Sequence, residues 1–149
     1  MLLHTRLILT VVPQPSFFEY ENMKKTNFVH VSENAFFSQE GKLSVIGIFD
    51  KIITTRLPVV QPGFAISLNV TSEVGTHKVK VEIVSPDNKL VVSVGGMVEV
   101  KNTEGGANFI ANLVGVPFVI AGKYVVKVFL DDEIIDEGTS IVIEYHENV

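Results

Sequence analysis

The four histidines are the residues of this sequence best suited to metal binding or proton transfer, and they are scattered along it. His4, His30, His77 and His146 each stand alone, and no two of them have the spacing of zinc ligands. His77 and His146 would meet only if the ends of their strands were neighbours. We therefore expect polar histidines at strand ends and no resident metal ion.

Two other kinds of segment offer groups that bind ions or phosphates. The acidic run Asp131-Asp132-Glu133, with Asp136 and Glu137 after it, has carboxylate oxygens of the type that calcium takes. Because it lies at the tip of an expected hairpin, a solvated turn is the better interpretation. The pairs Gly95-Gly96 and Gly105-Gly106 lack the helix N-terminus and the fixed lysine or third glycine of phosphate-binding loops. We expect these glycines at bends, and no cofactor.

Covalent catalysis has little support in the sequence. There is no cysteine, no serine stands in a nucleophile elbow, and no Ser-x-x-Lys occurs. A serine, a histidine and a carboxylate assembled from separate loops would leave no local signature, so a hydrolase of that kind stays open as an alternative. The expectation is a protein that is not an enzyme.

Length and composition predict one domain with a large core. The chain has 149 residues, of which 46% are hydrophobic and 19% charged, so it is richer in apolar residues than an average domain. Without cysteine it has no disulfide and no thiolate metal site. The net charge is −5 and lysine and arginine form no stripe, so neither nucleic acid nor an anionic membrane is an expected partner.

Alternation of apolar and polar residues with a period of two begins at Phe28 and predicts β structure. It is clearest from Lys78 to Ile83, which a turn at residues 85–88 connects to a return strand from Leu90 to Val100. Further strands are expected at residues 28–31, 43–52, 64–71, 108–113, 124–130 and 141–145, with residues 55–63 crossing between sheets. About eight strands and no helical period favour an antiparallel two-sheet sandwich.

The first 22 residues do not fit this pattern. Met1 to Val12 is apolar but is broken by His4 and Arg6, which makes it too short to span a bilayer and unlike a signal peptide. Met23-Lys24-Lys25 has the form of an ordinary bacterial start. We expect residues 1–22 to be an N-terminal extension or arm, with a degenerate export signal as the alternative, and residues 23–149 to be a single sandwich domain.

Two segments resemble known families. Residues 121–128, in which Gly122 and Tyr124 open an alternating strand, resemble the penultimate strand of immunoglobulin-like and fibronectin-like sandwiches. The segment Glu40 to Asp50, with Leu57-Pro58 after it, resembles a family of small uncharacterised bacterial proteins with a β-sandwich body. That resemblance runs from about Met23 to the C-terminus. It implies a bacterial, cytoplasmic protein, and it transfers no functional residue.

Several expected strands carry apolar residues on both faces, on the face toward the core and also on the opposite face. They predict an interaction surface, because a contiguous exposed apolar patch usually marks one. Scattered surface residues on strands covered by loops are the alternative. The candidate residues are Ile46, Ile48, Ile110, Val125 and Phe129.

These observations favour a non-enzymatic protein-binding or assembly module whose partner is another protein or a second copy of the chain. A sandwich that binds carbohydrate or another small ligand is the first alternative, although the chain has no tryptophan and only 3 tyrosines to stack on sugar rings. The hydrolase assembled from separate loops is the second.

Overall fold

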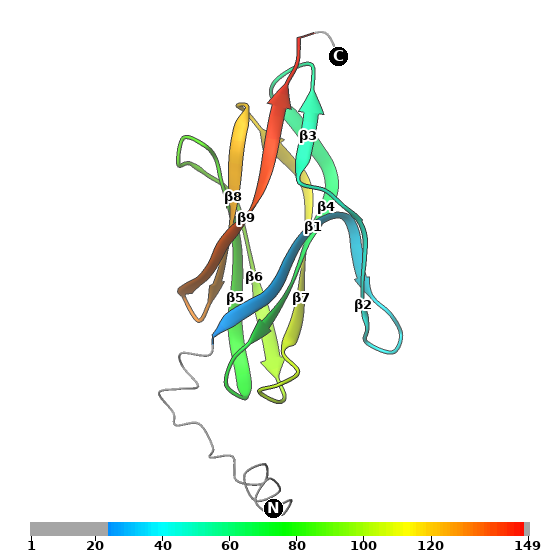
Figure 1. The fold of residues 1–149 in the computed structure, drawn as a ribbon, viewed down its shortest axis with the longest axis vertical. Coiled ribbons are helices and arrows are strands. Elements are labelled where there is room, and N and C mark those ends of the chain that lie inside the picture. Colours follow the sequence, from blue (N-terminus) through cyan, green and yellow to red (C-terminus); the bar gives the residue numbers. More distant parts are fainter. Residues whose placement is uncertain (1–23, 148–149) are drawn as a thin grey trace, which may run out of the picture.

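Strands make up most of the chain that the structure describes. The computed structural model describes residues 24–147, and in that range it contains nine strands and no helix (Figure 1). The predicted arm at residues 1–22 lies outside the described residues. The strands are β1 (Lys25–Phe37), β2 (Leu43–Ile48), β3 (Lys51–Thr54), β4 (Val59–Thr71), β5 (Gly75–Val84), β6 (Leu90–Val100), β7 (Ala107–Phe118), β8 (Gly122–Leu130) and β9 (Glu133–Tyr145).

The strands form two sheets that pack face to face. The first sheet has the order β2-β1-β4-β7 and the second has the order β3-β9-β8-β5-β6. All neighbours are antiparallel except β3, which runs parallel to β9. The predicted fold, an all-β, two-sheet sandwich of the immunoglobulin-like type, is confirmed.

One predicted strand is in fact two. The expected strand from Leu43 to Ile52 divides into β2 of the first sheet and β3 of the second. The amide of Phe49 donates to the carbonyl of Val31 at 2.9 Å, whereas the carbonyl of Asp50 accepts from the amide of Val142 at 2.8 Å. The chain therefore changes sheets between two adjacent residues, and the count is nine strands instead of eight.

The predicted crossover over residues 55–63 is too long, because β4 already begins at Val59. The sequence argued against a strand here because of Pro62, which cannot donate to a ladder. In the structure Gln61 pairs with Val116 and Gly63 with Val114. Pro62 thus stands opposite Gly115, whose φ of +67° is that of a bulge residue.

The core lies between the two sheets and follows the predicted alternation. On β5, Val79, Val81 and Ile83 are buried, whereas Lys80 and Glu82 between them are not. Tyr124 on β8 is buried against Phe118 with the rings edge to face at 4.9 Å, and its hydroxyl donates to the carbonyl of Ile120 at 2.8 Å. This tyrosine near the start of the penultimate strand confirms the local resemblance to immunoglobulin-like sandwiches.

Each sheet has one face on the core and one face outward. Side chains alternate between the two faces along a strand, and residues paired across strands share a face. The position of any residue relative to the core is therefore fixed by the pairing register. The register thus tells on which face of its sheet each surface residue lies.

Candidate interaction surface

A histidine and an aspartate form the most chemically distinctive pair among the described residues, at the end of the second sheet where β5 begins and β8 ends. The His77 ring is buried, with Nδ1 2.6 Å from Oδ2 of Asp131 and Nε2 2.7 Å from the carbonyl oxygen of Glu73. Asp131 also accepts the amide of Lys78 at 2.9 Å, and Nζ of Lys24 lies 3.8 Å from its carboxylate. The pair thus connects β5, the β8–β9 turn and the residue before β1.

The hydrogen bonds fix the protonation of the pair. Burial by itself would lower the pKa of His77, but the bonds to Asp131 and to the Glu73 carbonyl outweigh it, and the pKa is raised. Burial would likewise raise the pKa of Asp131, yet the bonds from His77 and Lys78 lower it. A carbonyl oxygen only accepts, so Nε2 donates to Glu73, and an imidazolium also donates to Asp131.

Both ring nitrogens of His77 are therefore occupied, and neither is free to take a proton from a substrate. The pair joins the segment between β4 and β5 to the β8–β9 turn. Residues 131 and 132 form an exposed turn, in which Asp132 pairs with Lys78 at 3.1 Å and Asp131 in addition holds the buried His77 ring. His77 likewise is a buried, ion-paired residue and not merely a polar histidine at a strand end.

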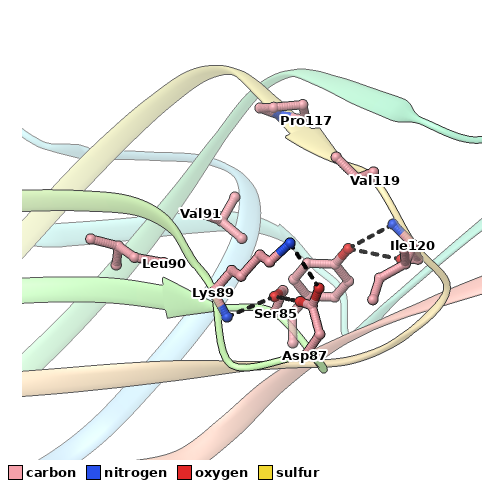
Figure 2. Close-up of a pocket in the computed structure, with 9 residues that line it drawn as sticks. Ser85, Asp87, Lys89, Leu90, Val91, Pro117, Val119 and Ile120 are labelled. Carbon is pink, nitrogen blue, oxygen red and sulfur yellow. Dashed lines mark hydrogen bonds and ion pairs between the residues drawn. The ribbon is translucent and has the colours of Figure 1, made fainter.

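A groove of about 280 Å³ opens at the other end of β5, between the β5–β6 turn and the β7–β8 connection (Figure 2). Leu90, Val91, Pro117, Val119 and Ile120 give it apolar walls. Ser85, Asp87, Lys89 and the Tyr124 ring complete its lining.

The polar groups of the groove bond to one another and stabilise the β5–β6 turn. The Ser85 hydroxyl donates to the carboxylate of Asp87 and accepts the amide of Lys89 at 3.1 Å. The Lys89 ammonium lies 3.7 Å from Asp87. No histidine is among the residues that line the groove. His77 precedes Ser85 of the groove by eight residues, which is about 26 Å in an extended strand. The groove therefore does not combine the serine and histidine that a hydrolase would need.

The five predicted surface residues do not share one face. Ile46, Ile48 and Ile110 lie on the outer face of the first sheet, whereas Val125 and Phe129 lie on the outer face of the second. The two groups are thus on opposite sides of the sandwich. Ile46 and Ile48 are exposed, and the other three are half-buried.

The outer face of the second sheet is charged. Its alternating residues include Lys78, Lys80 and Glu82 on β5, and Lys123 and Lys127 on β8. The ammonium of Lys80 lies 4.3 Å from the centre of the Phe129 ring, so a lysine covers the aromatic side chain that the sequence placed in a patch. The position of Phe129 on an outer face therefore does not require a partner protein to cover it.

The central part of the outer face of the first sheet carries no charged residue, and Lys25, which pairs with Thr71 at the start of β1, lies beyond that part. Cross-strand pairing assigns to it the alternate residues of four segments, Phe28 to Phe36 on β1, Ser44 to Ile48 on β2, Ala65 to Asn69 on β4 and Asn108 to Val114 on β7. Not one of them is Lys, Arg, Asp or Glu. We call this surface the uncharged face. Interface cores are depleted in charged residues in the same way.

Small polar residues occupy the middle of the uncharged face. Ser67 on β4 lies between His30 on β1 and Ile110 on β7 and is fully buried, and its hydroxyl has no hydrogen-bond partner among the described residues. Amides extend beside it, because Asn27 donates to Asn69 at 2.6 Å and Asn69 donates to Asn108 at 2.8 Å. Exposed isoleucines and Val114 border this centre at the two edges.

The described residues form neither a metal site nor a membrane-spanning helix. Residues 24–147 contain no group of three or more His, Asp or Glu side chains placed to hold a metal ion. Within the same range, no helix has the length and apolar character needed to cross a membrane.

Comparison with known families agrees with the second resemblance seen in the sequence. A family model described as a family of unknown function, DUF6941, matches residues 27–143, which is most of the chain. The chain belongs to the DUF6941 family. The expected membership of an uncharacterised β-sandwich family is thereby confirmed, while no curated protein matches the chain significantly.

Two solved structures align with most of this DUF6941 member at low sequence identity. An alkylpurine DNA glycosylase, AlkC, from Pseudomonas fluorescens, bound to DNA with an abasic site analogue, aligns with 82% of the chain at 10% identity and a TM-score of 0.46. The chain spans 30% of that enzyme. An immunoglobulin-like protein from Pseudomonas aeruginosa aligns with 81% of the chain and 96% of its own length, at 13% identity and a TM-score of 0.38.

Sequence reasoning missed two features of this DUF6941 member. The His77–Asp131 pair joins residues 54 apart, and only the β5–β8 register brings them together. The uncharged face had a visible signal, since charged residues are missing from alternate positions of four segments. Recognising it requires knowing which strands are neighbours.

Proposed function

We propose that this chain is a non-enzymatic protein-binding module and that the uncharged face is the surface it presents to its partner. The observation that carries the proposal is the contrast between the two outer faces of one sandwich. One face is covered with lysine and glutamate, and the other has none in the central segments of its four strands. A face in contact only with water gains nothing from losing its charges, whereas the centre of an interface does.

The details of the face agree with a protein partner. Exposed Ile46 and Ile48 supply apolar area at one edge. The lack of cysteine suits a reducing compartment, so we place the interaction in the bacterial cytoplasm.

The other candidate functions have weaker support. The Phe28 ring stacks on His30 at 5.0 Å, and the neighbouring amides bond to one another, so the aromatic surface and the polar groups that a sugar would use are already engaged. A hydrolase would need a serine beside a histidine, which neither the groove nor the His77 pair provides.

The test introduces lysine on each outer face, at positions whose side chains are equally exposed. The double variant Ile46→Lys with Ile48→Lys changes the uncharged face, and Met97→Lys on β6 changes the charged face. Ile48 is 60% exposed and Met97 62%, so both sites accept a lysine with little cost to the fold.

The measurement is fluorescence-detected sedimentation of each labelled variant in an extract of the source cells. We expect the original chain and Met97→Lys to sediment as a complex and the isoleucine double variant to sediment as the free chain. A complex that survives the double variant, or that Met97→Lys alone abolishes, would overturn the proposal.

A further inference from the structure

We propose that a second copy of this chain pairs with the free edge of β7, so that two four-stranded sheets join into one sheet of eight strands across a two-fold axis. The inference rests on the proposed function and names the partner, since β7 forms one border of the uncharged face. It follows from a comparison of the four sheet edges.

Free strand edges usually carry features that prevent pairing with another chain, such as short length, charge, proline or bulges. β2 has six residues and is bent at Gly47, where φ is +72°. β3 has four residues and carries Lys51, which is paired with Glu144 at 3.2 Å. β6 contains Glu99 and is flanked by lysines at positions 89 and 101.

β7 lacks these features over most of its length. Residues 107–114 read Ala-Asn-Phe-Ile-Ala-Asn-Leu-Val, with no charge, no proline and no glycine. Gly115 in the left-handed region and Pro117 come only at the far end of the strand. Val114 is 83% exposed, the highest value among the large hydrophobic residues described. The segment is therefore a free edge of eight residues that is open to pairing.

The sequence of this edge is complementary to itself. A two-fold axis perpendicular to the sheet leaves each side chain on the same face, and paired residues share a face. The axis must therefore lie at the level of one residue that pairs with its own copy, and not at a level between two successive residues. With the axis at Ile110, this residue faces its own copy and Asn108 faces Asn112 of the other chain. Apolar groups then meet apolar groups and amides meet amides.

The lack of charge along β7 allows a second copy to occupy the edge, although the chain as a whole is negatively charged. The chain has a net charge of −5, so two copies repel each other over most of their surfaces. Pairing along β7 places no carboxylate of the paired segment opposite another carboxylate. The edge also continues the uncharged face, and the joined sheet extends that face without interruption.

The register gives a test by disulfide formation, because the chain has no cysteine of its own. Cysteine replaces Ile110, Asn108, Asn112 or Met97, one at a time in the full chain, and the rate of dimer formation is followed under mild oxidation. Ile110→Cys should crosslink at least tenfold faster than Met97→Cys. Met97 is much more exposed than Ile110, so random collision would give the opposite order.

The two asparagine variants supply the control on register. Asn108→Cys and Asn112→Cys should each crosslink slowly alone, since four residues, or about 13 Å, separate each from its own copy, and a mixture of the two should crosslink rapidly. Rates for Ile110→Cys and the mixture that do not exceed that of Met97→Cys would overturn the inference.

A variant without cysteine gives an independent measurement. Asn112→Lys with Val114→Lys adds charge to the exposed edge, and sedimentation should change from dimer to monomer while the melting temperature of the monomer is retained. A purified chain that is monomeric at 100 μM would also overturn self-pairing. The proposed function would then stand or fall separately on the complex seen in cell extract.

Discussion

Asp131→Asn is the change that tests the pair of His77 and Asp131 most directly. Asp131 has φ of +50°, and asparagine tolerates the left-handed region as aspartate does, so the turn keeps its backbone while the charge is removed. The buried His77 then loses a charged acceptor at 2.6 Å. The asparagine oxygen still accepts from the ring, so a hydrogen bond to a charged group, worth about 1.5–3 kcal/mol, is replaced by a neutral one worth about 0.5–1.5 kcal/mol. We therefore expect a loss of about 1 kcal/mol in the free energy of unfolding near pH 5.5.

The loss should depend on pH in a defined direction. The raised pKa of His77 means that its contribution is complete below the unfolded pKa of about 6.5 and is lost as pH rises through the folded pKa. The lowered pKa of Asp131 means that its contribution is present above about pH 4 and is lost as pH falls through the folded pKa. The difference between the original chain and Asp131→Asn is therefore largest from about pH 4 to 6.5 and smaller at pH 8.5.

The assay is urea unfolding of the two chains at pH 5.5 and 8.5, with Asp132→Asn as the control. Asp132 is the adjacent residue, also has a positive φ of 68°, and forms an exposed ion pair, so its replacement should cost less than about 0.5 kcal/mol. Equal effects of the two variants, or a difference that does not shrink at pH 8.5, would refute the reasoning.

Three other changes test separate parts of the structure. Tyr124→Phe removes the hydroxyl that bonds to Ile120 and should cost about 1 kcal/mol in urea unfolding, with no change in association. Val125→Thr with Phe129→Thr should lower stability by about 1–2 kcal/mol and leave sedimentation unchanged, because these residues lie on the charged face; weakened association would contradict that placement. Calorimetric titration with zinc or calcium should show no stoichiometric heat, and a thermal shift reversed by chelator would contradict this expectation.

The class of the fold was predictable because its evidence is local. Alternation and turn residues identified the β5–β6 and β8–β9 hairpins, whose strands are neighbours both in sequence and in space. The division of the segment from Leu43 to Ile52 was not predictable, since the pattern of side chains continues across it. Only the partners of Phe49 and Asp50, which lie in different sheets, reveal the change.

The sequence predicted that each surface candidate faces away from the core, but not which of these residues lie on the same sheet. Alternation correctly placed Ile48 and Val125 on faces away from the core. It carries no information on which sheet a strand joins, so residues on opposite sides were combined into one surface. It also does not reveal that the stem of Lys80 covers Phe129.

The parallel pairing of β3 with β9 has a mechanical consequence. β1 begins at the lower end of the sandwich and β9 ends at the upper end, so tension between the two ends of the domain acts along the strands (Figure 1). The pairing runs in register from Lys51 with Val142 to Thr54 with Tyr145, and the amide of His146 extends it by a bond to Thr54. Pulling on β9 would slide it past β3 and strain these hydrogen bonds together instead of opening them one by one. The hydrogen bonds between β3 and β9 therefore resist tension on the last strand all at once.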